Sequence, residues 1–471
     1  MNRFHSLMAG VPVADGARVA VRYPYDGTVS GEAIMAGAED VEVAIRLHLE
    51  AGEPLSRYRR HEILENARRE LTNRADEFAH LIRSETGLAM RETRYEVGRA
   101  CDVLQFAAMQ ALVDDGEIYS CDISPQGKAR KIFTLREPHR LALGITPFNH
   151  PLNQVAHKVA PAIAAGTPMM LKPSDKTPLT AIRFAELLYA AGLPGRMLSV
   201  FVAPVDSVVE PLIRDERIEV VSFTGGTAVG KRIASIAGYK KLCLELGGCS
   251  PLIVLRDADL ALAASLAAEG CFRNSGQRCT SVRRILVDRA IESEFTEAFL
   301  AAASAYVAGD PADEKTTVGT VINELSATEL ESRIHEACAG GARLLRGGGR
   351  RGAQLEPTVL GDVSRDARLV RLESFGPIAP ILAVDGLDDA IRYANDTPYG
   401  LSSAIVTNNL ESVLRAVKGL RVGTVNVNQV PGYRIEMSPF GGVKDSGIGV
   451  KEGVVEAMKF LSTVKTFSLP W

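Results

Sequence analysis

The sequence predicts an α/β fold built on mostly parallel sheets, and three observations indicate it. Helix-like and strand-like patterns alternate along nearly the whole chain, without repeats or low-complexity segments. The 471 residues are 46% hydrophobic and 24% charged, which suits two or three domains with sizeable cores rather than long disordered stretches. No window approaches the roughly 20 consecutive apolar residues of a membrane span. We therefore expect a globular protein made of several α/β units.

Charge and cysteine content exclude several classes of function. The formal net charge is −3 and no dense block of Lys and Arg occurs, so neither nucleic acid nor an anionic membrane is expected as a partner. The seven cysteines are scattered and include no C-x-x-C pair, which argues against a disulfide framework or a zinc site. Residues 1–10 lack the long apolar core of a leader peptide, so a cytoplasmic location is expected.

The first third of the chain is predicted to be helical and then to form a hairpin. Apolar residues recur every three or four positions in residues 41–112, for example Ile63, Ala67 and Leu71. Arg99 then lies on one of these helices. Residues 117–143 change to shorter alternation with a turn at 125–127, which predicts a β-hairpin arm of the kind that often joins subunits.

After the arm, short apolar runs predict the strands of a doubly wound sheet, separated by helical stretches. A second α/β region is expected to begin near Gly247. The predicted strands are residues 141–145, 169–171, 198–201 and 220–223.

Two polar segments follow these strands. Residues 222–230 read Ser-Phe-Thr-Gly-Gly-Thr-Ala-Val-Gly, so glycines allow a tight turn and a following helix offers free N–H groups to a pyrophosphate. A purely structural turn explains such a cluster about equally well. Lys172 and Asp175 follow another strand, where a cation and a carboxylate could hold ribose hydroxyls, although a solvated turn fits the same residues.

The segment Asn-Ser-Gly-Gln-Arg-Cys-Thr at 274–280 sets Cys279 among small and polar residues, beside Arg278. The thiolate is the reactive form of cysteine, and a neighbouring guanidinium lowers the thiol pKa from about 8.5 toward neutrality. Cys279 is therefore a candidate nucleophile. The alternative is a small buried side chain, as most intracellular cysteines are.

Five motifs in order resemble the aldehyde dehydrogenase superfamily from about residue 24 to the C-terminus. They are Thr-Pro-Phe-Asn at 146–149, Glu-Leu-Gly-Gly at 245–248, the cysteine segment, Glu-Ser-Phe-Gly-Pro at 373–377 and Pro-Phe-Gly-Gly-Val-Lys-Asp-Ser-Gly at 439–447. The resemblance implies a Rossmann-type NAD-binding domain, an α/β catalytic domain and a β-hairpin oligomerisation arm. These would be residues 1–116 with 138–246, residues 247–446, and residues 117–137 with 447–471. It also implies a homodimer or homotetramer.

The resemblance assigns three catalytic roles. Cys279 would attack an aldehyde carbon, the Asn149 amide and the Cys279 N–H would hold the oxyanion, and Glu245 would activate the water that hydrolyses the thioester. The presence of Glu245 favours release of a free acid over transfer to coenzyme A. Cys249 stands where lysine is common in the family, and we interpret it as a packing residue.

The resemblance also implies the cofactor contacts. Glu373 would hold the nicotinamide ribose, Phe375 would pack near the ring, and Asp175 would disfavour the 2′-phosphate of NADP, so NAD is favoured. The complete predicted set is Thr146, Pro147, Phe148, Lys172, Ser174, Asp175, Gly225, Thr227, Gly230, Leu246, Gly247, Glu373 and Phe375.

Cationic and hydrogen-bonding groups around the nucleophile suggest an aldehyde with an anionic tail, because arginine binds phosphate, phosphonate and carboxylate in bidentate fashion. The alternative is that Arg99 and Arg278 form ion pairs with nearby carboxylates. The predicted substrate residues are Arg99, His150, Arg278, Thr280, Tyr433 and Arg434.

Within the superfamily, His150 and the Arg278-Cys279 pair resemble the group that oxidises phosphonoacetaldehyde to phosphonoacetate. Non-phosphorylating glyceraldehyde-3-phosphate dehydrogenases also resemble the chain, but usually carry tyrosine where His150 stands. Lactaldehyde, glycolaldehyde and succinate semialdehyde stay open as substrates. A non-catalytic structural oligomer is the remaining alternative, and it predicts the loss of catalytic residues that are all present.

Overall fold

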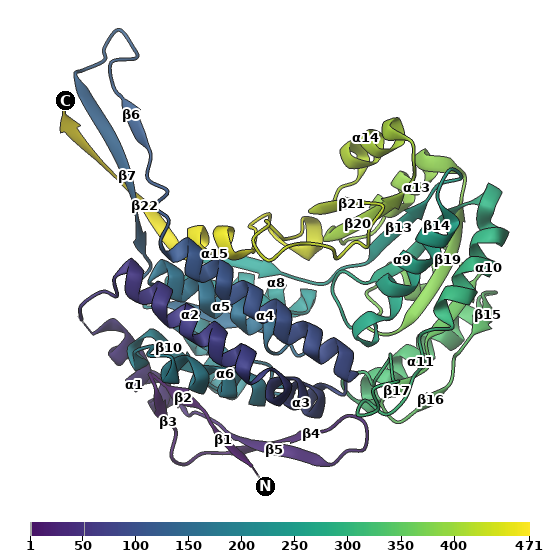
Figure 1. The fold of residues 1–471 in the computed structure, drawn as a ribbon, viewed down its shortest axis with the longest axis horizontal. Coiled ribbons are helices and arrows are strands. Elements are labelled where there is room, and N and C mark those ends of the chain that lie inside the picture. The colour runs from purple at the N-terminus through teal and green to yellow at the C-terminus, as the bar shows by residue number, and fades with distance from the viewer. Residues whose placement is uncertain (1, 51) are drawn as a thin grey trace.

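Two seven-stranded sheets, each covered by helices on both faces, form the body of the computed structural model, which describes residues 2–50 and 52–471 (Figure 1). The first sheet has the order β12-β11-β8-β9-β10-β2-β3. Its parallel strands are β8 (Ala142–Ile145), β9 (Met169–Lys172), β10 (Leu198–Val200), β11 (Val220–Thr224) and β12 (Lys241–Glu245), with β2 (Leu7–Met8) and β3 (Val11–Pro12) antiparallel at one edge. The strands predicted in this region and the α/β class are confirmed.

The strand order of the first sheet reverses between β8 and β11. The chain passes from β8 to β9 to β10 on one side, then returns to place β11 and β12 on the other side of β8. In an open α/β sheet, the crevice at the carboxyl ends of the strands flanking such a switch point is where ligands bind. The loops after β8 and β11 are therefore expected to form a binding site.

Helices cover both faces of this sheet. Helices α2 (Arg57–Asn73), α3 (Ala75–Thr86), α4 (Met90–Ala111), α5 (Asn153–Ala165) and α6 (Leu179–Ala190) share one apolar core with it. Helices α1 (Ala38–Leu49), α7 (Glu210–Arg214) and α8 (Thr227–Ile236) pack on the other face. A small sheet of β1 (Arg3–His5), β5 (Val29–Ile34) and β4 (Arg18–Arg22) lies near the N-terminus. The helical prediction for residues 41–112 is confirmed.

The second sheet, which begins after Gly247 as predicted, has the order β15-β18-β19-β14-β13-β20-β21. Its strands are β13 (Ser250–Val254), β14 (Val282–Asp288), β15 (Arg343–Arg346), β18 (Thr358–Gly361), β19 (Ile378–Val384), β20 (Ser402–Val406) and β21 (Thr424–Val427). Helices α9 (Leu260–Phe272) and α10 (Glu292–Ala303) pack on one face. Helices α11 (Glu324–Ala339), α12 (Arg368–Arg371), α13 (Gly386–Asn395) and α14 (Leu410–Gly419) belong to the core on the other. Strands β16 (Arg350–Arg351) and β17 (Gln354–Leu355) form a short antiparallel hairpin.

A three-stranded arm projects from the body (Figure 1). Strand β7 (Arg130–Pro138) pairs with β6 (Ile118–Ser120) on one side and with β22 (Ser462–Pro470) on the other, so the predicted hairpin gains a third strand from the C-terminus. The Gly127 N–H donates to the Ser124 carbonyl at 2.8 Å across the predicted turn. Apolar side chains are exposed along the arm, among them Ile123, Phe467 and Trp471.

The domain limits and assembly through the arm stay predictions. Helix α15 (Val454–Phe460), just before β22, packs against α5 and α4 in the body. Among the residues that the structure describes, no helix is both long enough and apolar enough to cross a membrane.

Candidate active site

The loop that carries Cys279 has an unusual backbone. Asn274, Ser275 and Gly276 follow one another at φ 57°, 52° and 69°, all in the left-handed region. Such a conformation costs a non-glycine residue roughly 1–2 kcal/mol. The loop therefore needs specific contacts to hold it, and the structure provides them from two directions.

The first set of contacts comes from the loop after β8. The Asn149 side-chain amide donates to the Gln277 carbonyl at 2.8 Å, and the Asn274 amide donates to the Asn149 carbonyl at 3.2 Å. The Gln277 N–H donates to the Asn274 carbonyl at 2.9 Å, which closes the turn. These bonds join the two α/β regions beside Cys279. They also leave the second N–H of the Asn149 amide available to a substrate oxygen.

The second set comes from Arg283 on β14. Its buried guanidinium donates to the carbonyls of Gly276 and Gly376, the latter at 2.7 Å, and burial lowers its pKa to about 10. A Cβ atom on Gly276 would overlap the backbone of Gly376, so only glycine fits there. The cysteine loop and the loop of Glu373 and Phe375 are thus packed backbone to backbone.

The Cys279 thiol is half-buried, and burial raises its pKa to about 12, with Glu373 and Glu245 adding to the increase. Arg434 and Arg278 lower it by less. Loss of solvation therefore outweighs the charge of the adjacent Arg278, which does not bring the thiol pKa toward neutrality in this structure.

Glu245 ends β12 and is buried beside the same cavity as Cys279. Neither of its carboxyl oxygens has a hydrogen-bond partner among residues 2–50 and 52–471. Burial, and then the charge of Glu452, raise its pKa well above the ordinary value. Glu452 is itself held by Lys158 at 2.7 Å. A carboxyl with a raised pKa and free oxygens can take a proton from water.

A cavity of about 310 Å³ opens onto Cys279 at the switch point of the first sheet. Gly225 and Gly226, which directly precede α8, line it, so the N-terminus of that helix lies next to the cavity, where a pyrophosphate can be bound. Glu373 lies against Gly247 and accepts the Gly248 N–H at 3.1 Å. These features fit a dinucleotide.

The structure brings seven of the thirteen predicted cofactor residues to the wall of this cavity. They are Pro147, Phe148, Gly225, Leu246, Gly247, Glu373 and Phe375. The Phe148 and Phe375 rings meet edge to face at 5.8 Å. Gly230 packs against Leu246, and Thr227 lies near Gly247.

The other predicted cofactor residues lie outside the wall of the cavity. Lys172 pairs with Asp175, and the Lys172 carbonyl accepts the Thr146 N–H at 3.1 Å. Ser174 is also outside the lining.

Several site residues were missed by sequence reasoning. Four residues of α11 form one wall of the cavity: Ser326, Glu329, Leu330 and Arg333. The buried pair of Lys158 and Glu452 was also missed. Lys158 lies in α5, whose residues are almost all buried. A lysine inside such a helix needs a buried partner, and this is the sequence feature that could have revealed the pair. Cys249, as interpreted, is buried, and its thiol donates to the Val370 carbonyl at 3.3 Å.

On the substrate side, Arg99 is not free. Its Nε donates to Glu436 at 2.5 Å, and the same buried carboxylate accepts a bond from His157 at 2.5 Å. Arg434 lies 3.8 Å from Glu436. The ion-pair alternative therefore holds for Arg99. Glu436, which sequence reasoning missed, carries one charge for three basic side chains.

Arg278 differs from Arg99. Its Nη2 donates to the Glu269 carbonyl at 3.2 Å, and no carboxylate lies within ion-pair distance of it in the described part of the chain. Burial lowers its pKa, and the nearby charges of Arg273 and Arg99 lower it further. Arg434 is also desolvated, which lowers its pKa, and it stacks 4.1 Å over the Phe440 ring. Buried nitrogens of Arg278 and Arg434 lack partners among the described residues.

The remaining substrate candidates are His150, Thr280 and Tyr433. His150 lies 3.5 Å from Glu96, whose other oxygen accepts the N–H groups of Leu152 and Asn153 at the start of α5. Thr280 packs against the loop of Gly432, next to the exposed Tyr433. None of the six predicted substrate residues lines the 310 Å³ cavity.

Residues 12–467 of this chain match the Aldehyde dehydrogenase family. A 3-sulfolactaldehyde dehydrogenase of Priestia megaterium is 38% identical over 437 residues, 93% of this chain and 91% of that protein. Aldehyde dehydrogenase 21 from Physcomitrella patens, solved with the reaction product succinate, superposes with a TM-score of 0.94 at 33% identity over 99% and 98% of the chains. GapN from Methanocaldococcus jannaschii, a glyceraldehyde-3-phosphate dehydrogenase solved with NADP, gives 0.92 at 35% over 98% and 100%.

The raised thiol pKa predicts the pH dependence of Cys279 alkylation in the cofactor-free protein. Only the thiolate reacts, and below the pKa its fraction increases about tenfold per pH unit. The rate of iodoacetamide labelling at Cys279, measured by peptide mapping, should therefore keep rising from pH 7 to pH 10. Cys279→Ser gives the background from the other cysteines. A plateau reached below pH 9 would contradict the raised pKa.

Proposed function

Because this chain belongs to the aldehyde dehydrogenase family, we propose that it oxidises a short aldehyde with an anionic far end to the free acid, with NAD as the oxidant. NAD(P)-dependent aldehyde oxidation follows from the family. The finer statement rests on one observation: Arg278 and Arg434 both act on the Cys279 thiol, and each has a buried guanidinium nitrogen without a partner among the described residues.

The proposed reaction begins at Cys279. Its sulfur attacks the aldehyde carbon, and the resulting oxyanion accepts hydrogen bonds from the free Asn149 amide N–H and the Cys279 backbone N–H. A single donor of this kind typically lowers the barrier by about 3 kcal/mol. The bond from Asn149 to the Gln277 carbonyl fixes the amide in position before substrate arrives. The thiohemiacetal loses hydride and becomes a thioester on Cys279.

Glu245 is proposed to complete the reaction. Its unpartnered carboxyl oxygens take a proton from a water molecule, which attacks the thioester and releases the acid and the free thiol. The charges of Lys158 and Arg434 lower its pKa and partly oppose the effect of burial. Hydrolysis, rather than transfer to coenzyme A, follows from this base.

The cofactor residues are proposed to hold NAD along the cavity at the switch point. When bound, NAD accepts the hydride that leaves the thiohemiacetal. The start of α8 receives the pyrophosphate, Glu373 the nicotinamide ribose, and Phe148 with Phe375 the ring face. Lys172 and Asp175 hold the adenosine ribose, and the Asp175 carboxylate repels a 2′-phosphate, which favours NAD over NADP.

The anionic tail is proposed to bind Arg278 and Arg434, because both have buried nitrogens without partners, while Glu436 already neutralises Arg99. His150, Thr280 and Tyr433 are proposed to complete the binding site for the substrate. Phosphonoacetaldehyde is the leading candidate. A second candidate is 3-sulfolactaldehyde, whose sulfonate has the same tetrahedral anionic shape, and the 38% identical relative supports it. Glyceraldehyde-3-phosphate, lactaldehyde, glycolaldehyde and succinate semialdehyde are the comparison substrates.

Removing the charge of Arg278 tests this substrate class. Arg278→Met should raise the KM for phosphonoacetaldehyde at least tenfold, because a hydrogen bond to a charged group contributes about 1.5–3 kcal/mol, and should change the KM for propanal little. NADH formation with each aldehyde gives the measurement. Arg343→Met, on the exposed start of β15, is the control.

Wild-type kcat/KM values for the six candidate aldehydes, with propanal as the reference, then rank the candidates. The proposal fails if phosphonoacetaldehyde and 3-sulfolactaldehyde are turned over no better than propanal. It also fails if Arg278→Met and Arg434→Met both leave the KM for the anionic aldehydes unchanged.

Removing Asp175 tests the preference for NAD. Asp175→Ala should raise kcat/KM for NADP by about tenfold, equivalent to about 1.4 kcal/mol of relieved repulsion, and should change kcat/KM for NAD less. Asp366→Ala, a surface carboxylate elsewhere, is the matched control. Wild-type protein that uses NADP as well as NAD would refute the assignment.

A further inference from the structure

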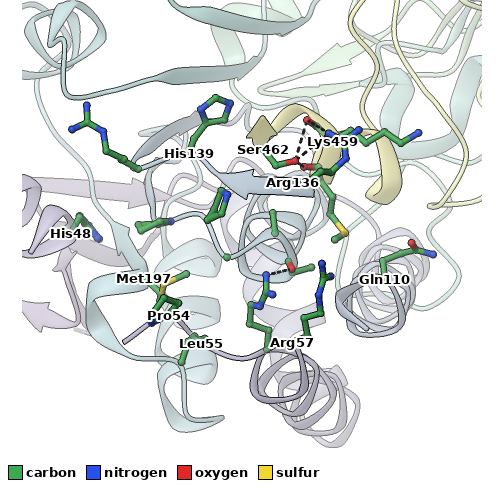
Figure 2. A pocket seen from close by; sticks show the side chains of 18 of the residues that line it. His48, Pro54, Leu55, Arg57, Gln110, Arg136, His139, Met197, Lys459 and Ser462 are labelled. Atoms are coloured by element: carbon green, nitrogen blue, oxygen red, sulfur yellow. Dashed lines mark hydrogen bonds between the residues drawn. The ribbon is translucent and has the colours of Figure 1, made fainter. Parts of the chain in front are cut away.

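A second cavity, of about 460 Å³, lies at the other end of α5 from the reaction site. Residues before and within α2, the C-terminal end of α5, the start of the arm and α15 form its walls (Figure 2). It shares no lining residue with the cavity beside Cys279. Its volume is within the range of small-molecule sites.

The walls of this cavity are strongly basic. Six cationic side chains line it: Arg57, Arg60, Arg136, Arg140, Arg196 and Lys459. Asp115 is the one carboxylate among its described lining residues, and it pairs with Arg136 at 2.5 Å. His48 adds no charge, because burial lowers its pKa to about 4 and both ring nitrogens are hydrogen-bonded. Carboxylates outside the lining pair with three more of these cations: Arg57 lies 3.3 Å from Asp114, Arg140 lies 2.6 Å from Glu219, and Lys459 lies 3.0 Å from Glu456. Among the described residues, Arg60 and Arg196 are the lining cations that no carboxylate pairs with.

Arg60 has no carboxylate partner within the described ranges. Its Nη1 donates to the Ala164 carbonyl at 2.6 Å, at the end of α5, while its Nε is buried without a partner. Burial lowers its pKa, and so does the like charge of Arg57 one turn away. Within the described ranges, the Arg196 side chain likewise donates to a carbonyl alone, that of Glu53. An anion between these groups would relieve both the repulsion and the lost solvation.

The arm side of the cavity supplies further polar groups. His139 bonds Glu219 through Nδ1 at 3.0 Å, and its Nε2 is buried without a partner in the described chain. Arg136 and Ser462 lie beside it, 3.4 Å apart (Figure 2). Between the basic walls the lining is apolar, with Pro54, Leu55, Met197 and Met458. The cavity thus combines anion donors with a surface for an organic group.

We propose that this cavity binds a small organic phosphate monoester, its phosphate held by Arg60 and Arg57 and its organic part packed on Leu55, Met197 and Met458. Two guanidinium groups one helical turn apart match the several acceptor oxygens of a phosphate dianion. Helix α5 begins three residues after His150 and ends at this cavity, so the ligand contacts the helix that follows the reaction-site loop.

Calorimetric titration of the intact protein tests the proposal. The protein is first saturated with NADH, so that the dinucleotide cavity is filled. Adenosine monophosphate, and inorganic phosphate as the head group alone, are then titrated, with adenosine as the uncharged comparison. The proposal predicts one site per chain for adenosine monophosphate, no binding of adenosine, and weaker binding at high salt.

Variants separate this cavity from other surfaces. Arg60→Met should weaken adenosine monophosphate binding at least tenfold, and Leu55→Trp should block it by filling the apolar part without removing charge. Arg343→Met, an exposed arginine on β15, should bind as the wild type does. Arg60 also bonds the end of α5, so Arg60→Met could lose binding because the protein misfolds. Leu55→Trp keeps Arg60 and therefore tests the cavity independently of that effect.

Two results would overturn the proposal. One is that neither adenosine monophosphate nor phosphate binds the NADH-saturated wild type. A second copy of the chain that covers the cavity would produce this result. The other is unchanged affinity in both Arg60→Met and Leu55→Trp.

Discussion

The hydrogen bond from the Asn149 amide to the Gln277 carbonyl, at 2.8 Å, is the contact on which the site depends. With the return bond from Asn274, it ties the loop after β8 to the loop of Cys279 and stabilises three consecutive left-handed residues. Because the two loops belong to different α/β regions, this contact joins the regions beside Cys279. It places the oxyanion donor next to the nucleophile, while Arg283 holds the other side of the Cys279 loop.

Burial then sets the chemistry of the groups brought together there. The thiol of Cys279 and the carboxyl of Glu245 both have raised pKa values, because each loses water and each lies near other acids. Basic side chains oppose this effect: Lys158 acts on Glu245, and Arg434 acts on both. The site is therefore a balance between desolvation, which favours neutral forms, and a few fixed positive charges, which favour the anions that react.

Local sequence was sufficient for much of this. Strands, helices and the hairpin of the arm followed from periodicity and turn residues, whereas the grouping of Cys279, Glu245 and Asn149 came from the resemblance to the aldehyde dehydrogenase superfamily. Glu436 and Arg283 could not be found in this way, because each acts on residues far away in the chain. The four residues of α11 that line the cavity could not be found from the sequence for the same reason. The raised thiol pKa is not visible in the sequence either, because loss of solvent is a property of the folded protein.

The most direct test of the account asks whether the acid is released by a base at Glu245 from a thioester on Cys279. Glu245→Gln, mixed with NAD and phosphonoacetaldehyde and followed by NADH absorbance and intact-protein mass, should form about one NADH per chain. It should then stop, with the acyl group bound to Cys279. Cys279→Ala should form neither. Sustained turnover by either variant would contradict the account.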